Sequence, residues 1–285
     1  MKSYGIYGYE ISKRAEFDDF NLIPLTDNYT TAKERASDLN SYHLTGFLEI
    51  NGSNSLDNKS LLFDLQGVLS FIDQKNVIIT NELRVHESYN DLDEDYPRQL
   101  TALKRINGGG GVILGDTFSP TSRKNFIVMA LAKLKESDIE GGPFRTAFFK
   151  SIEVFRGSDS FIDFNYYLLF SALESLARFH LDDYKSSNCS TPIAKFLKPY
   201  GFDISQDNVD SMAKAVSTYA RIRNALFHNG KLECEVNING RMKKIDIFDY
   251  YSQFSMLIPL VLIKYIGFDD GHINWNCWLD RMPFK

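Results

Sequence analysis

The sequence predicts an α+β protein, in which an N-terminal mixed α/β domain rich in strands precedes an all-α helical bundle with a small β-hairpin insertion. Short apolar and aromatic runs broken by Asn, Asp and Gly dominate residues 1–142, and long runs of helical periodicity dominate residues 143–285. The change coincides with a Gly-Gly-Pro turn at 141–143. We therefore expect two domains, 1–142 and 143–285.

The elements of the N-terminal half follow from apolar runs and their breaks. Aromatic and β-branched residues predict strands, and apolar residues three and four apart predict helices. We expect strands at 3–11, 45–50, 61–72 and 77–86, and helices at 30–42 and 122–136.

In the C-terminal half the predicted elements are mainly helices. The Asn239-Gly240 pair is a strong signal for a hairpin with strands at 232–238 and 241–247. The last helix is so apolar that we expect surplus surface suited to a subunit interface. The predicted helices are 144–155, 160–182, 192–197, 205–228 and 246–266.

Composition excludes several classes of protein. The 285 residues carry a net charge of −5, with 15 basic against 21 acidic residues in 1–142 and 17 against 16 in 143–285. Neither half has the basic excess of proteins that bind long nucleic acids mainly by charge, so RNA binding would need a local positive cleft. The three cysteines suggest neither a disulfide framework nor a zinc site, which favours a reducing cytoplasm. We expect no cofactor and no metal.

The sequence also lacks the marks of a membrane protein. The most apolar run, 256–268, contains Pro259 and Lys264 and is shorter than the roughly 20 residues that a span needs. The N-terminus has no long apolar region of the signal-peptide kind. We therefore expect a soluble protein.

The candidate site lies in the stretch 219–230. Apolar residues at 209, 213, 216 and 220 predict one face of a helix, and Arg223 lies within roughly 40° of its centre, where a packed helix normally has an apolar residue. Asn224 and His228 are four residues apart and share a neighbouring face. Asn229-Gly230 predicts the helix end, so His228 belongs to its last turn. We expect these polar groups to converge at the border of a buried surface.

Such a set suits cleavage of RNA without a metal. An arginine can hold a phosphate, an asparagine can orient groups, and a histidine can move a proton to or from the ribose 2′-hydroxyl. A buried polar network that locks helices together is the alternative explanation.

A polar stripe on the predicted helix 160–182 offers supporting residues. Glu174 and Arg178 are four apart and form either an exposed ion pair or part of a cleft beside Arg223, with Glu174 holding the guanidinium or tuning His228. Tyr219, at the start of the candidate stretch, is a further supporting residue.

Arg223-Asn224, followed by His228 after four intervening residues, resembles the signature of the HEPN superfamily (higher eukaryotes and prokaryotes nucleotide-binding domain). The helix 161–179 is similar to the long preceding helix of ApeA-like HEPN domains in bacterial antiviral proteins. The resemblance covers the C-terminal half. It implies a metal-independent RNA endonuclease with a cleft assembled from two HEPN domains, hence a homodimer, and 2′,3′-cyclic phosphate products.

The resemblance further implies a bacterial antiviral defence or toxin effector, with the N-terminal domain as sensor or regulator. Arg223 would bind the scissile phosphate, His228 would act as acid or base, and Asn224 would position both. The competing interpretation is a noncatalytic module that binds nucleotide or RNA, or that dimerises. The sequence identifies neither a phage-derived trigger nor an antitoxin.

Overall fold

The computed structural model describes residues 2–51, 55–82, 99–101, 110–119, 121–156, 161–238 and 240–285. It contains two compact units, the N-terminal unit (Met1–Ala132 with Phe155–Ser158) and the C-terminal unit (Lys133–Val154 with Asp159–Lys285). They divide inside the helix α3 (Ser122–Glu140), whereas the predicted boundary lies after it. The N-terminal unit holds an antiparallel sheet with helices and the C-terminal unit is mainly helical, so the α+β class is confirmed.

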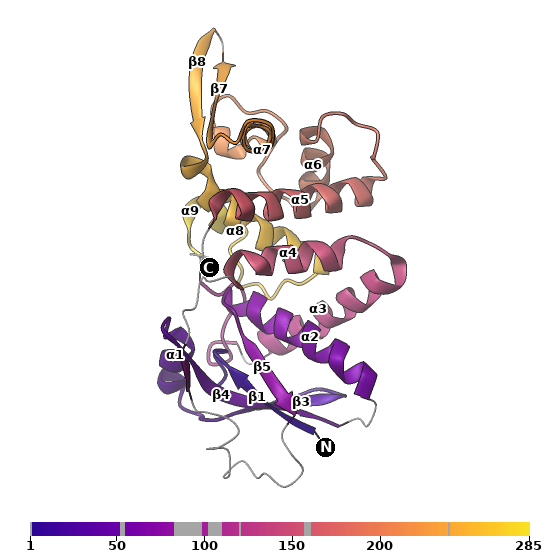
Figure 1. The fold of residues 1–285 in the computed structure, drawn as a ribbon, viewed down its shortest axis with the longest axis vertical. Helices are drawn as coiled ribbons and strands as arrows, with labels where there is room; N and C mark the ends of the chain where they lie inside the picture. Colours follow the sequence, from indigo (N-terminus) through magenta and orange to yellow (C-terminus); the bar gives the residue numbers. More distant parts are fainter. Residues whose placement is uncertain are drawn as a thin grey trace. The chain divides into compact units, whose positions relative to one another are not determined.

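The sheet of the N-terminal unit has the order β2-β3-β4-β1-β5, and β6 also pairs with β4. Figure 1 labels β1, β3, β4 and β5 of this sheet. The long strand β4 is buried along nearly its whole length. A Cβ atom at Gly46 of this strand would lie 2.6 Å from the backbone oxygen of Ile23, so the β3–β4 approach requires glycine there. The strands are β1 (Lys2–Tyr7), β2 (Ala15–Glu16), β3 (Phe20–Pro24), β4 (Ser41–Ile50), β5 (Ile78–Glu82) and β6 (Gln99–Thr101).

The predicted strand 61–72 is wrong, because this segment belongs to the helix α2 (Ser55–Asp73). Leu65, Val68, Leu69 and Ile72 are all fully buried, and their spacing of three, one and three is that of one helix face. The helical period is not evident in the sequence, because the run is apolar nearly throughout. A helix forms here and not a strand, because one helix face packs against the core.

Smaller differences concern where elements begin and end. The helix predicted at 30–42 is α1 (Tyr29–Ser37), capped by the Asn28 side chain, and residues 41 and 42 belong to β4 instead. The strand predicted at 3–11 ends at Tyr7, where Gly8 has a φ of 78°. The short strands β2 and β3 were not predicted. Residues 83–86 of the predicted strand 77–86 lie outside the described residues.

The C-terminal unit surrounds the long helix α5 with α6, α7 and α8, and the hairpin β7–β8 follows α7 (Figure 1). The predicted helices and hairpin strands are all present, with ends shifted by a few residues except at the start of α7. The elements are α4 (Phe144–Arg156), α5 (Ile162–Leu181), α6 (Ser190–Leu197), α7 (Val216–Asn229), β7 (Glu233–Ile238), β8 (Arg241–Asp246), α8 (Ile247–Ile266), α9 (Cys277–Asp280) and the 3₁₀ turns η1 (Lys198–Tyr200) and η2 (Met212–Lys214).

Aromatic side chains join three of these helices. Phe254 of α8 stacks on Tyr166 of α5 and on Tyr219 of α7, with ring centroids 5.1 and 4.8 Å apart. The Tyr166 hydroxyl donates a hydrogen bond of 2.8 Å to the backbone oxygen of Tyr219. This buried cluster fixes α7 against α5, and with it the candidate residues that α7 carries.

Helix α8 exposes Phe248 near its start but buries most of its apolar surface, unlike the predicted surplus. Its residues from Leu257 to Ile263 are all buried, so the apolar run serves the core of the chain itself. The proposed interface therefore needs another surface. No helix among the described residues has both the length and the hydropathy to cross a bilayer.

Candidate functional site

Helix α7 carries the three candidate residues and begins later than predicted. The helix predicted from residue 205 starts at Val216, and the Asn208 side chain accepts hydrogen bonds from the backbone N–H groups of Asp210 and Ser211. This turn competes with helix formation, so the apolar spacing from residue 209 is accidental and Val209 is exposed. At its other end α7 stops at Gly230, in the left-handed conformation with a φ of 61°, as predicted.

Arg223 projects from α7 toward α5 and is held on two sides. Its Nη2 donates to Glu174 Oε2 at 3.0 Å, and its Nη1 donates to Asn224 Oδ1 at 2.8 Å. The Arg223 side chain is 29% exposed and that of Glu174 is 17% exposed. These two contacts use two of the five N–H groups of the guanidinium, and the others remain able to meet a ligand.

Glu174 serves two arginines at once. Its Oε1 accepts a hydrogen bond of 2.9 Å from Arg178 Nε, one turn further along α5. Arg178 also donates to the backbone oxygens of Asp183 and Ser186, in the loop after α5. The sequence left open whether Glu174 pairs with Arg178 or holds Arg223, and the structure shows both. The resulting network joins α5, α7 and this loop.

Aromatic rings surround the Arg223 guanidinium. Its Cζ lies 5.4 Å from the centroid of the buried Phe170 ring and 6.0 Å from that of Phe227, within cation–π range. Phe227 is half exposed and contacts Tyr167 of α5 at 4.7 Å between centroids. Phe164, one turn before Tyr167, is 55% exposed. The exposed aromatic patch formed by Phe164, Tyr167 and Phe227 was not predicted, although Phe164 and Tyr167 follow helical spacing on α5.

His228 lies on a different side of α7 from Arg223. Five residues at about 100° each place the two side chains roughly 140° apart around the axis, with a rise of ~7.5 Å. Both Asn224 and His228 are exposed. No hydrogen bond or ion pair with a described residue is found for the His228 side chain, so Glu174 does not contact it. The structure shows the expected contact between Arg223 and Asn224, whereas the convergence of His228 with them stays a prediction.

Tyr219 belongs to the core and not to the candidate site. It is 1% exposed, and its hydroxyl donates to the backbone oxygen of Ala213 at 2.7 Å. Burial raises the pKa of this phenol well above its ordinary value. Tyr219 supports the site only by fixing α7 in place.

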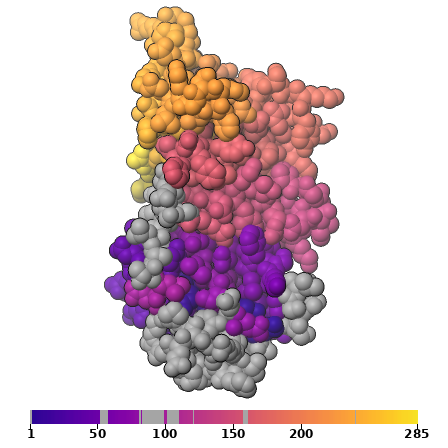
Figure 2. Space-filling model, in the orientation of Figure 1, coloured from indigo at the N-terminus to yellow at the C-terminus, as the bar shows by residue number. Residues whose placement is uncertain are grey.

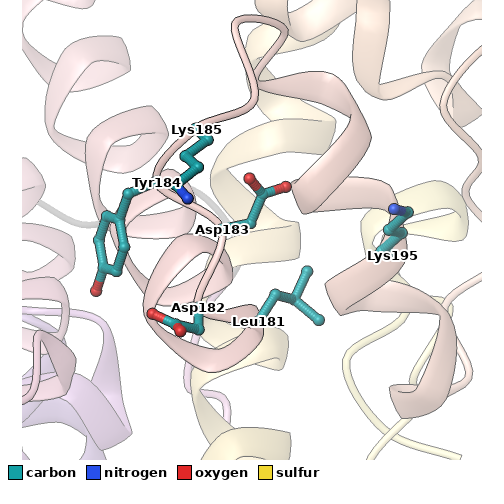
Figure 3. A pocket seen from close by; sticks show the side chains of 6 residues that line it. All are labelled: Leu181, Asp182, Asp183, Tyr184, Lys185 and Lys195. Atoms are coloured by element: carbon teal, nitrogen blue, oxygen red, sulfur yellow. The ribbon is translucent and has the colours of Figure 1, made fainter.

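A surface hollow of about 480 Å³ lies at the C-terminal end of α5 (Figure 3). Two acidic and two basic side chains line it, and Lys195 of α6 faces the end of α5 and the loop after it, which supply the others. None of the predicted site residues lines it. The lining residues are Leu181, Asp182, Asp183, Tyr184, Lys185 and Lys195.

The site built by α5 and α7 thus consists of an oriented arginine, an exposed aromatic patch and an exposed histidine. Within the described part of the chain, no cluster of three or more His, Cys, Asp or Glu side chains suits a metal ion. Comparison of the chain with protein-family models, with curated proteins and with solved structures gave no match.

Proposed function

We propose that the chain is a metal-independent RNA endonuclease of the HEPN type, with Arg223, Asn224 and His228 as its reacting and positioning groups. The observation that carries the proposal is the Arg223 guanidinium, oriented by Glu174 and Asn224 and left partly exposed on a helix that ends in an exposed histidine. A fixed guanidinium stabilises charge that develops on a phosphate without having to reorganise.

In the proposed reaction the ribose 2′-oxygen attacks the adjacent phosphorus atom and the bond from phosphorus to the 5′-oxygen breaks. One histidine accepts the proton of the 2′-hydroxyl and another donates a proton to the leaving 5′-oxygen. The products are a 2′,3′-cyclic phosphate and a free 5′-hydroxyl, with no oxidant, reductant or metal consumed. Arg223 stabilises the negative charge on the non-bridging oxygens.

This chemistry requires two copies of the site. Because His228 and Arg223 point to different sides of α7, we propose a homodimer in which the histidine of one copy serves the arginine of the other. The exposed aromatic patch beside Arg223 is the surface that favours this dimer, in place of α8. We further propose a cytoplasmic defence or toxin role, with the N-terminal unit as sensor or regulator. Cys189, Cys234 and Cys277 are all free, which fits a reducing compartment.

Cleavage of total RNA in EDTA tests the activity, and the His228→Ala variant tests the site. His228 is exposed and unpaired among the described residues, so its loss should lower the rate by ~10² to 10⁴ without affecting stability. His272→Ala, at another exposed histidine of the same unit, is the matched control. RNA that is bound but never cut by the wild-type protein would favour the noncatalytic interpretation.

The Arg223→Lys variant separates phosphate binding from packing. A lysine can still pair with Glu174, but its point charge cannot hold a carboxylate and a phosphate with a planar fork. We expect most of the stability and only a fraction of the activity to remain. Full activity in this variant would argue against a role for the guanidinium in the reaction.

The dimer is tested by Phe164→Glu, which places a charge in the exposed aromatic patch away from the reacting groups. We expect a monomer by analytical ultracentrifugation and loss of RNA cleavage. Phe248→Glu, at a more exposed phenylalanine of α8, should leave both unchanged. A monomeric protein that still cleaves RNA would overturn the two-copy site.

A further inference from the structure

The hairpin β7–β8 projects from the C-terminal unit directly after the helix that carries the candidate residues (Figure 2). Because directly opposed residues of an antiparallel pair point to the same side, the register defines two faces. The face that carries the buried residues Val236 and Ile245 is called the inner face. It comprises Cys234, Val236, Ile238, Arg241, Lys243 and Ile245. The outer face comprises Glu233, Glu235, Asn237, Met242, Lys244 and Asp246.

The two faces carry opposite charge. The outer face has three carboxylates and one lysine, Lys244, which pairs with Glu233. The inner face has two cations, Arg241 and Lys243, and no carboxylate. Both cations are exposed, and neither forms an ion pair with a residue that the structure describes. The inner face of the hairpin is therefore a local positive surface in a chain whose net charge is −5.

The inner face continues onto α7. Helix α7 packs against both β7 and β8. Burial raises the pKa of the Cys234 thiol of the inner face, and the positive charge of Arg221 on α7 acts on this thiol, because it opposes the rise. Arg221 is exposed and lies three and seven residues before Asn224 and His228, so the three side chains share one face of α7. The surface thus runs from His228 past Arg221 to Lys243 and Arg241.

The turn between α7 and β7 is fixed by backbone hydrogen bonds. Gly230 N–H donates to the Leu226 oxygen at 2.9 Å, and Lys231 N–H donates to the Ala225 oxygen at 3.1 Å. This pair of hydrogen bonds is that of a Schellman motif. Ile247 N–H then donates to the Leu232 oxygen, which ties the base of the hairpin together. The direction of the hairpin relative to His228 is therefore set by the fold.

We propose that the inner face of the hairpin, with Arg221, binds the phosphate backbone of the RNA substrate and extends the candidate site beyond the scissile bond. This inference rests on the proposed nuclease function. Six residues of strand at ~3.4 Å each carry Arg241 roughly 20 Å beyond the helix end. We expect the surface to give affinity for RNA without reading its sequence, because its exposed cations contact the phosphates that every sequence shares.

Binding as a function of salt tests the surface. Fluorescence anisotropy with a labelled 20-nucleotide single-stranded RNA is measured at several salt concentrations in a His228→Ala background, which keeps the RNA intact. For single strands each lost phosphate contact reduces the slope of log K against log salt by ~0.7, which corresponds to about fourfold in affinity at 0.15 M salt. R241Q/K243Q should therefore bind roughly fifteenfold more weakly with a slope smaller by about 1.4.

The control variant removes the same charge from other places. K198Q/K244Q changes one exposed lysine of η1 and the lysine of the outer face, and it should bind like the unmodified protein. Arg221→Gln alone should reduce the slope by about half as much as R241Q/K243Q does. An unchanged slope in R241Q/K243Q, an equal loss in the control, or no RNA binding by the starting protein would each overturn the proposal.

A short substrate separates this inference from the nuclease proposal. A dinucleotide reaches only the scissile site, so R241Q/K243Q should cleave it as fast as wild type while cleaving the 20-nucleotide RNA with a raised KM and an unchanged kcat. Cleavage of both substrates at wild-type rates by R241Q/K243Q overturns the surface and leaves the nuclease standing. Salt-dependent binding without any cleavage supports the surface and overturns the nuclease.

Discussion

Replacing Glu174 by Gln removes the charge that two arginines share while keeping the shape of the side chain. Exposed ion pairs contribute ~0 to 1 kcal/mol, and hydrogen bonds to charged groups ~1.5 to 3 kcal/mol when buried. The Glu174 and Arg223 side chains are 17% and 29% exposed, so their pair lies between these limits. We expect a coupling energy of roughly 1 kcal/mol between Glu174 and Arg223, and a total loss of about 2 kcal/mol for Glu174→Gln.

The assay is urea unfolding of wild type, Glu174→Gln, Arg223→Gln and the double variant, followed by tryptophan fluorescence. Both tryptophans, Trp275 and Trp278, belong to the C-terminal unit, so the signal reports on the unit that holds the pair. The exposed pair Lys244–Glu233 is the control and should show no measurable coupling. Additive effects of the Glu174 and Arg223 substitutions would refute the claim that this pair fixes the guanidinium.

Three further predictions concern other parts of the chain. Arg123→Met should destabilise the N-terminal unit by ~3 to 5 kcal/mol, measured by circular dichroism during thermal unfolding, because it leaves the buried carboxylate of Asp73, 2.9 Å from Arg123 Nη2, without its partner. Gly230→Ala should cost ~1 to 2 kcal/mol in urea unfolding, since Gly230 has a φ of 61° and open space around it, so only backbone strain contributes. Burial, and to a smaller extent Asp280, raises the pKa of the Cys277 thiol from 9.0 to about 11. The stability from this protonated thiol should therefore be complete below pH 9 and be lost as the pH rises through 11, and Cys277→Ala should lack that step.

The sequence predicted most helices of the C-terminal unit because each combines a sustained period with a clear end, such as Gly230 after α7. It failed at α2, where an apolar run conceals the period of Leu65, Val68, Leu69 and Ile72. It failed again at the start of α7, where the Asn208 side chain captures backbone N–H groups that a helix would use. In both segments the local backbone conformation depends on features that apolar spacing does not report. These are tertiary packing for α2 and the Asn208 side chain for the start of α7.

The candidate site shows the same limit. Spacing on one helix predicted that Arg223 faces the packed side and that Asn224 and His228 share a face. It could not predict that Glu174 contacts Arg178 and Arg223 at once, because the second contact depends on how α5 and α7 pack. The exposed aromatic patch was missed for a similar reason, since Tyr167 and Phe227 meet only across these two helices.

Because Arg223 and His228 have different surroundings, a loss of activity on substitution has a different meaning at each residue. Arg223 packs against α5 through Glu174 and would also bind phosphate in the proposed nuclease, because Glu174 and Asn224 use only two of its N–H groups. A loss of activity on changing Arg223 therefore fits either a nuclease or a packing role. His228 contributes no hydrogen bond or ion pair to the described structure, so a loss of activity there has no packing explanation. Since the two side chains point roughly 140° apart on α7, the proposed reaction would then use the histidine of a second copy.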